Sequence, residues 1–214
     1  MINNKLASVL MSLAAQDSSL NFGANPASYY QYLAATPAPY CGVDVAPMEN
    51  FDLERYTGTW FIQKPNKDVF WQNRNWACSE ARYNAQPDGT IEVINSSQLD
   101  GDLKQTNLEE RTYFPGSARC DPGLGQCYVS FPGLPAPEYS NYIVAYTDYD
   151  NYAIVYSCQE RDLKKLVAVL SRDASFDFRL HDEAMQKVTE LVPGYDLDRL
   201  YAPYQGDKCT YANW

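Results

Sequence analysis

The stretch of sequence that decides the fold is ENFDLERYTGTWF, residues 49–61. It opens with Asn-Phe-Asp and then places Tyr56, Gly58 and Trp60 in a Y-x-G-x-W pattern. The run that begins inside it, GTWFIQKP (58–65), is rich in the aromatic and branched residues that favour β-strands. The stretch therefore marks the start of the strand-forming part of the chain.

Seven more strand-like runs follow, separated by turn residues. They are ACSEARYNA (77–85), TIEVINSS (90–97), TNLEERTYF (106–114), QCYVSF (126–131), NYIVAYT (141–147), YAIVYSC (152–158) and LKKLVAVLS (163–171). QPDGT (86–90) predicts a hairpin turn, and DYDN (148–151) predicts a second tight turn. Eight short strands at regular spacing favour a closed sheet, because closure removes the edges that an open sheet must protect.

One helix is predicted after the last strand, within SRDASFDFRLHDEAMQKVTELVPG (171–194). Phe178, Met185, Val188 and the pair 191–192 form its apolar stripe, and the Pro-Gly pair at 193–194 ends it. The predicted fold class is all-β. It is an eight-stranded, up-and-down antiparallel barrel with one C-terminal α-helix packed outside.

Composition narrows the function classes. The chain has 214 residues, 45% of them hydrophobic, which suits one domain or one domain with an arm. The net charge is −10 and the basic residues are scattered, so nucleic acid and anionic membrane surfaces are poor partners.

The six cysteines and the single histidine indicate the compartment and argue against catalysis. No cysteine pair has C-x-x-C spacing, and the even number at wide spacing predicts three disulfides. We therefore expect a secreted protein, or one in another oxidising compartment such as the lumen or intermembrane space of an organelle. His181 falls in a polar helical stretch, where a surface histidine is expected. No metal site, cofactor or catalytic residue is predicted.

The first forty residues differ in character from the rest. Residues 1–16 form either a signal peptide, with Lys5 before an apolar run at 6–15, or a retained amphipathic helix. The run is too short to span a bilayer, so no transmembrane segment is expected. Residues 17–40 are rich in Pro and Tyr and predict an extended arm, either a loose tail or a segment that lies on a protein partner. The predicted domain comprises residues 41–214.

Three motifs in order resemble those of the lipocalin family. ENFDLERYTGTWF (49–61) matches the opening motif, YTDYDNYAIVYSC (146–158) is similar to the second, and LVAVLSRDASFD (166–177) is similar to the third. The resemblance covers residues 41 to 212 and is strongest to the apolipoprotein D and bacterial-lipocalin branch. It implies the predicted barrel.

The resemblance also implies structural roles. Arg172 would lie over the ring of Trp60 at the closed end of the barrel, a cation–π contact of roughly 1–2 kcal/mol when shielded from water. By resemblance, Cys41 pairs with Cys158 and Cys78 with Cys209. The pair Cys120 and Cys127 is inferred from proximity alone.

Strand alternation predicts which side chains meet a ligand. With Trp60 pointing inward, Ile62 also points inward, and the third strand offers Ile91 and Val93. Arg172 at the base of the last strand turns Leu166 and Ala168 inward. The resemblance supplies the remaining ligand-binding positions, which are Ala81, Tyr83, Val129, Phe131, Tyr142, Val144, Tyr146 and Val155.

Asn95 begins an Asn-Ser-Ser glycosylation sequon. The alternation that turns Ile91 and Val93 inward also turns Asn95 inward, unless the strand has already ended. We therefore predict that Asn95 carries no glycan or lies at the barrel mouth.

The predicted function is to bind and carry a small hydrophobic ligand such as a fatty acid, sterol, retinoid, carotenoid or bilin, without catalysis. The apolar lining with a few tyrosine hydroxyls suits such a ligand, although side chains can also fill a barrel of this size. The alternative is a structural or interaction subunit of a larger assembly, docked through residues 1–40, in which the cavity is secondary.

Overall fold

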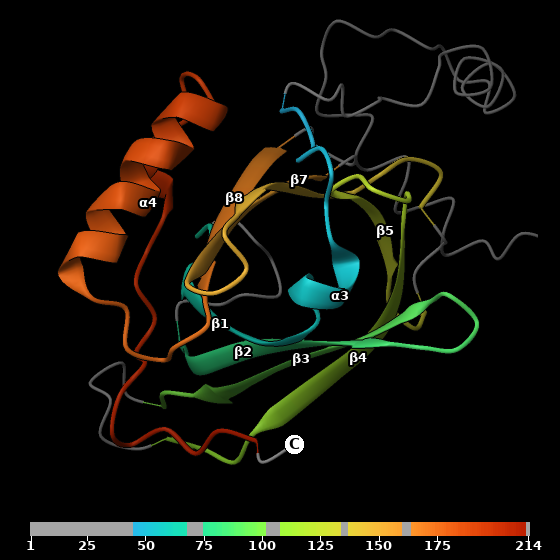
Figure 1. The fold of residues 1–214 in the computed structure, drawn as a ribbon. Coiled ribbons are helices and arrows are strands. Elements are labelled where there is room, and N and C mark those ends of the chain that lie inside the picture. Colours follow the sequence, from blue (N-terminus) through green and yellow to red (C-terminus); the bar gives the residue numbers. More distant parts are fainter. Residues whose placement is uncertain (1–44, 68–74, 102–107, 134–136, 160–163, 213–214) are drawn as a thin grey trace, which may run out of the picture. The chain divides into compact units, whose positions relative to one another are not determined.

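The computed structural model describes residues 45–67, 75–101, 108–133, 137–159 and 164–212, all within the compact unit Cys41–Trp214. Eight strands form a closed barrel in which each pairs antiparallel with the next, and β1 pairs with β8 (Figure 1). The predicted barrel is confirmed. The strands are β1 (Gly58–Lys64), β2 (Trp76–Ala85), β3 (Ile91–Leu99), β4 (Thr112–Cys120), β5 (Gln126–Ser130), β6 (Tyr142–Thr147), β7 (Tyr152–Gln159) and β8 (Lys164–Ser171).

Two tight turns set the register of the hairpins. Between β2 and β3, Asp88 accepts hydrogen bonds from the backbone and hydroxyl of Thr90, and Gly89 has a φ of 83°. Between β6 and β7, the Asp148 carboxylate accepts from the backbone N–H groups of Asn151 and Tyr152. Both turns lie where the sequence predicts them.

The fourth strand lies further along the chain than predicted. The prediction placed it at residues 106–114, whereas β4 spans Thr112–Cys120. Pro115 and Gly116 look like strand breakers but lie inside β4. Pro115 comes before Ser117, the first β4 residue that pairs with β5. The side of β4 that faces β5 is therefore unpaired at Pro115, and an unpaired strand edge tolerates a residue without an N–H.

Three strands carry register shifts. They fall between Ile62 and Lys64 in β1, between Ala77 and Glu80 in β2, and between Val144 and Tyr146 in β6. An irregularity of this kind places an extra residue opposite the partner strand, so the inward and outward sides exchange beyond it.

One helix, α4 (Phe178–Leu191), packs outside the barrel against β7 and β8 (Figure 1). Asp177 caps its N-terminus by accepting from the Leu180 N–H. Ala184 and Val188 are its fully buried residues. Phe178 was expected in the buried stripe but is 80% exposed. It lies two residues, or about 200° of helix rotation, from Leu180, so it points away from the barrel.

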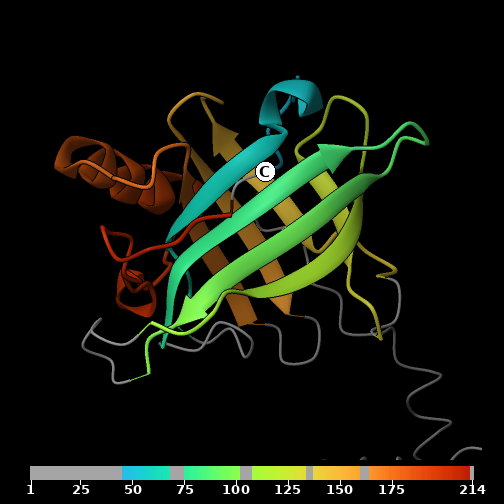
Figure 2. The same ribbon diagram turned by 90° about the horizontal axis from the view of Figure 1, so that it is seen from below.

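The short helix α3 (Leu53–Tyr56) lies across one end of the barrel and places Tyr56 in the barrel interior (Figure 1). After α4 comes the 3-10 turn η1 (Leu197–Arg199), and the C-terminal segment then runs along the outside of β1 and β2 (Figure 2). Tyr211 of this segment meets Phe61 edge to face, with ring centroids 4.8 Å apart.

The molecule has two apolar cores. One lies in the barrel interior and includes Trp60, Ala81, Val93, Val144 and Leu170. The second lies between α4 and the outer faces of β6, β7 and β8. Alternation on these strands sends neighbouring residues to different cores.

Candidate ligand-binding site

The closed end of the barrel is built around Trp60, which is fully buried. Its indole N–H donates to the Tyr56 carbonyl at 2.8 Å. The Arg172 guanidinium carbon lies 3.8 Å from the ring centroid. The same guanidinium donates to the backbone carbonyls of Arg55, Tyr56, Thr59 and Tyr149. Arg172 thus joins α3, β1 and the β6–β7 turn.

Gly58 of the Y-x-G-x-W pattern is explained by this arrangement. Its φ is 96°, a left-handed conformation that side chains rarely adopt. A Cβ at this position would lie 3.4 Å from the Nη1 of Arg172. Glycine therefore lets the chain turn from α3 into β1 while Arg172 lies close to it.

Most residues predicted to meet a ligand lie in the barrel interior. Val129, Tyr142 and Ala168 are partly buried and pack against the inner core. Seven more belong to the core itself, namely Ile62, Ala81, Tyr83, Ile91, Val93, Val144 and Val155.

Leu166 and Phe131 also lie on the inner side. Leu166 is buried and shares a face of β8 with Ala168, two residues further along. Phe131 follows the end of β5, and its Cδ1 lies 2.8 Å from where a Cβ on Gly116 would stand. Gly116 lies on the same face of β4 as the interior residue Ala118. The ring of Phe131 therefore covers the inner face of β4.

Tyr146 was predicted to face the ligand, and this is wrong. It packs in the outer core, with its ring 5.3 Å from that of Tyr152 and 5.5 Å from the Lys187 ammonium of α4. The register shift between Val144 and Tyr146 is the cause. Strict alternation counted from Val144 therefore assigns Tyr146 to the inner face of β6, which is the wrong one.

Three tyrosine hydroxyls form a chain in the barrel interior. The hydroxyl of Tyr142 lies 2.9 Å from that of Tyr56 and 2.8 Å from that of Tyr83. We call Tyr56, Tyr142 and Tyr83 the tyrosine chain. Burial raises the pKa of Tyr83 to about 12 and raises the pKa values of Tyr56 and Tyr142 well above the ordinary tyrosine value. All three are therefore neutral hydrogen-bonding groups near pH 7.

Burial inside the barrel is uneven. Trp60 and Val144 are fully buried, whereas the inward-facing Asn95, Leu99 and Phe114 keep part of their surface exposed. Phe114 stacks on Trp76, the first residue of β2, with ring centroids 5.0 Å apart. Some inward-facing side chains therefore keep accessible surface, while those around Trp60 are tightly packed.

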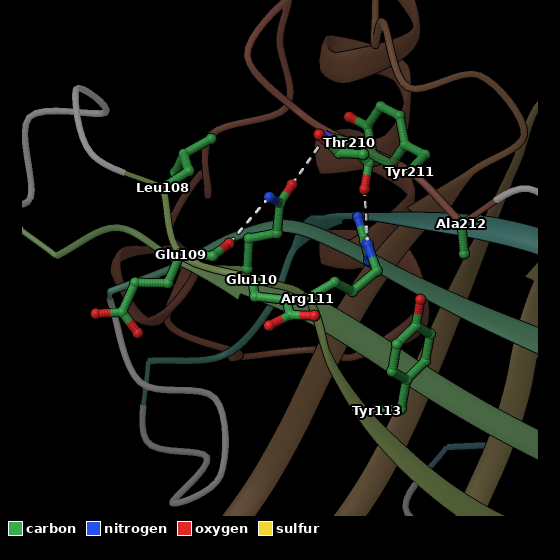
Figure 3. A pocket seen from close by; sticks show the side chains of 9 residues that line it. Leu108, Glu109, Glu110, Arg111, Tyr113, Thr210, Tyr211 and Ala212 are labelled. Atoms are coloured by element: carbon green, nitrogen blue, oxygen red, sulfur yellow. Dashed lines mark hydrogen bonds between the residues drawn. The ribbon is translucent and has the colours of Figure 1, made fainter.

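A hollow of about 510 Å³ lies outside the barrel, beside the C-terminal segment (Figure 3). Arg111 lies in its wall and forms a buried ion pair with Glu80, at 3.3 Å. Arg111 also donates to the carbonyls of Thr210 and Cys78, and Glu80 accepts from the Ala212 N–H. These charges bind the C-terminal segment to β2, which gives them a structural role.

Two disulfides lie among the described residues, and one of them joins the C-terminal segment to β2. Cys78 pairs with Cys209 and Cys120 with Cys127, as expected. The predicted pair Cys41–Cys158 lies outside the described residues.

His181 lies on α4 with its Nδ1 3.0 Å from an Asp182 carboxylate oxygen. In the described parts of the chain, no group of three or more His, Cys, Asp or Glu side chains could hold a metal ion.

Among the residues that the structure describes, no helix has the length and apolar character needed to cross a membrane.

Sequence reasoning missed three interior residues. Tyr56 belongs to the Y-x-G-x-W pattern, but its role in the tyrosine chain depends on α3 folding across the barrel end. Phe114 was placed at the end of its strand rather than near its start. Trp76 precedes the predicted second strand and reaches the interior only because β2 shifts register between Ala77 and Glu80.

Comparisons with known proteins agree with this architecture. A family model described as a lipocalin-like domain matches residues 51–205. Apolipoprotein D of Mus musculus is 33% identical over 118 residues, which cover 51% of this chain and 53% of the relative. The match thus spans about half the length of that relative. Temperature-induced lipocalin-1 of Arabidopsis thaliana is 27% identical over 174 residues, 78% of this chain and 86% of the relative.

Solved structures share the fold at lower identity. Insecticyanin from the tobacco hornworm Manduca sexta superposes with a TM-score of 0.62 at 22% identity, covering 82% of this chain and 92% of that one. The amine-binding protein of Rhodnius prolixus, solved as a tryptamine complex, has a TM-score of 0.55 at 20% identity, covering 78% and 90%. The family match covers the whole barrel, and the barrel carries the Trp60–Arg172 contact that the motifs imply. This chain therefore belongs to the lipocalin family, on its apolipoprotein D-like branch.

Proposed function

We propose that this protein binds and carries a small hydrophobic molecule in the barrel interior. The observation that carries the proposal is the apolar surface that inward-facing residues leave exposed. Trp60 closes one end completely, while the apolar, inward-facing Val129, Phe114 and Ala168 keep exposed surface. Removing such apolar surface from water is favourable, and an apolar ligand bound inside the barrel would do so.

The relatives support binding rather than catalysis. The Rhodnius prolixus protein holds tryptamine, and its fold is shared by this chain. The described interior contains tyrosine hydroxyls and apolar side chains, and His181 lies outside on α4. We propose an elongated apolar ligand from the classes of fatty acid, sterol, retinoid, carotenoid or bilin. The disulfides Cys78–Cys209 and Cys120–Cys127 suit an oxidising compartment, and we propose secretion.

The test is binding of the uncharged fluorescent probe N-phenyl-1-naphthylamine to the full chain. Ala168 is paired with Val155 on the inner side, so Ala168→Trp places a ring in the proposed site. We expect this variant to weaken probe binding about tenfold or more. The control is Ser117→Trp, which places the same ring on the exposed outer face of β4. Equal probe binding by both variants and the unchanged protein would contradict the proposal.

A further inference from the structure

Asn95 is a polar side chain in an apolar part of the barrel. It lies in the middle of β3, paired with Ala81 on β2 and Phe114 on β4. Its neighbour Ser96 points outward, where its hydroxyl bonds Glu80 and Arg111. Alternation therefore turns the Asn95 carboxamide inward, as the sequence predicts.

Asn95 is also available for a new contact. It is half-buried, and in the described part of the chain no group hydrogen-bonds to its side chain. A carboxamide carries two donors and an acceptor, and leaving them unpaired in apolar surroundings is unfavourable. A polar group on a bound molecule would satisfy them.

The tyrosine chain offers a second free group. Its three hydroxyls carry three protons, and two hydrogen bonds join them. Whichever hydroxyl donates in each bond, one hydroxyl proton has no acceptor within the tyrosine chain. Tyr83 pairs with Val93, so Asn95 is the next inward position along β3. Such diagonal neighbours lie roughly 7–8 Å apart, which one ligand group can bridge.

The charged side chains on neighbouring strand positions face the outside. Lys64 pairs with Val169, which packs in the outer core, and Glu80 bonds the C-terminal segment. Arg119 lies one residue beyond the interior residue Ala118, so it points outward. The inward positions whose side chains the structure describes are apolar or uncharged. A carboxylate placed among them would lose its hydration without gaining a counter-charge.

Resting on the proposed function, we propose that Asn95 and the tyrosine chain hold an uncharged oxygen group of the ligand, a hydroxyl or a carbonyl. The ligand is then a neutral apolar molecule that enters with this group toward the closed end. Fatty acids, whose head group is ionised near pH 7, are disfavoured relative to alcohols and esters of the same chain. This selects among the ligand classes named above.

The experiment uses full-length protein loaded with N-phenyl-1-naphthylamine at pH 7.5. Three competitors with the same sixteen-carbon chain displace the probe: hexadecan-1-ol, methyl palmitate and palmitate. We expect the alcohol and the ester to displace the probe at concentrations about tenfold lower than palmitate, a difference typical of one well-placed hydrogen bond. Asn95→Leu keeps the branched shape of the side chain but removes its hydrogen-bonding groups, and it should weaken the alcohol and the ester about tenfold while leaving palmitate unchanged. Glu92→Gln, on the exposed outer face of the same strand, is the matched control and should change none of them.

Three results separate the inference from the proposed function. If the probe binds but palmitate competes as well as the alcohol, the inference is wrong and the proposed function stands. The same holds if Asn95→Leu leaves the alcohol unaffected. If the probe does not bind at all, the proposed function fails and the inference fails with it.

Discussion

Trp60 and Arg172 stabilise the closed end in different ways. Trp60 contributes buried aromatic surface, while Arg172 satisfies backbone carbonyls from three segments and covers the Trp60 ring. We expect Trp60→Ala to lower the free energy of unfolding by about 3–5 kcal/mol. Arg172→Ala should cost less, and Arg172→Lys should recover only part of that loss, because an ammonium lacks the planar fork that reaches several carbonyls. Urea denaturation measures all three.

The outcome that contradicts these roles is specific. If Arg172→Ala changed the affinity for N-phenyl-1-naphthylamine while leaving the free energy of unfolding unchanged, Arg172 would be a ligand contact and not a structural residue.

The raised pKa of the buried Tyr83 leads us to expect a loss of stability at alkaline pH. Burial raises its pKa to about 12, whereas an unfolded tyrosine ionises near pH 10 (about its reference value). Between these values the folded chain holds a proton that the unfolded chain has lost, so stability falls as the pH rises. Tyr83→Phe should reduce this fall in urea denaturation between about pH 10 and pH 12, since the removed group no longer titrates. Tyr113→Phe, at a tyrosine that is 50% exposed, is the control. Identical pH profiles for the unchanged protein and Tyr83→Phe would refute the assignment.

At the scale of elements, the two observed disulfides should differ in their contribution to stability. Cys78 and Cys209 are 131 residues apart and tie the C-terminal segment to β2, whereas Cys120 and Cys127 are 7 apart and close one hairpin. The chain-entropy model gives about 5 kcal/mol for the long loop and about 2–3 kcal/mol for the short one. Replacing each pair by serines and measuring urea denaturation tests this. Equal losses would show that local packing, not loop closure, dominates.

Alternation along the strands predicts most of the barrel interior, and it fails where a strand is irregular. Ile62, Ile91 and Val93 lie inside as the pattern requires. Tyr146 does not, because β6 shifts register just before it, and neither the sequence nor its resemblance to relatives shows where such a shift falls. The predicted fourth strand ends at Phe114, whereas β4 continues through Pro115 and Gly116 to Cys120.

The closed end was predictable in a different way. The Y-x-G-x-W pattern and the arginine after the last strand identify Trp60 and Arg172. In the structure the guanidinium carbon of Arg172 lies 3.8 Å from the centroid of the Trp60 ring. The tyrosine chain was not predictable, because it joins α3, β2 and β6 through contacts between residues up to 86 positions apart. Such a network depends on barrel closure, which a local pattern does not encode.

At the scale of the whole molecule, the barrel separates the two apolar cores. The outer core holds α4 against the barrel, while Val129 and Ala168 of the inner core are only partly buried. The C-terminal segment closes the outside of β1 and β2 through Cys209 and the Glu80–Arg111 pair. We therefore propose that residues 41–214 carry the ligand-binding function. Docking through residues 1–40 remains the alternative function.

The measurement that tests this assignment most directly is native mass spectrometry of residues 41–214 beside the full chain, both titrated with N-phenyl-1-naphthylamine. The account predicts one probe molecule per chain in both, with similar affinity and with the 78–209 and 120–127 disulfides intact. A truncated chain that keeps its disulfides and its circular dichroism but binds no probe would contradict the account. The arm, with Tyr29, Tyr30 and Tyr32, would then belong to the binding site.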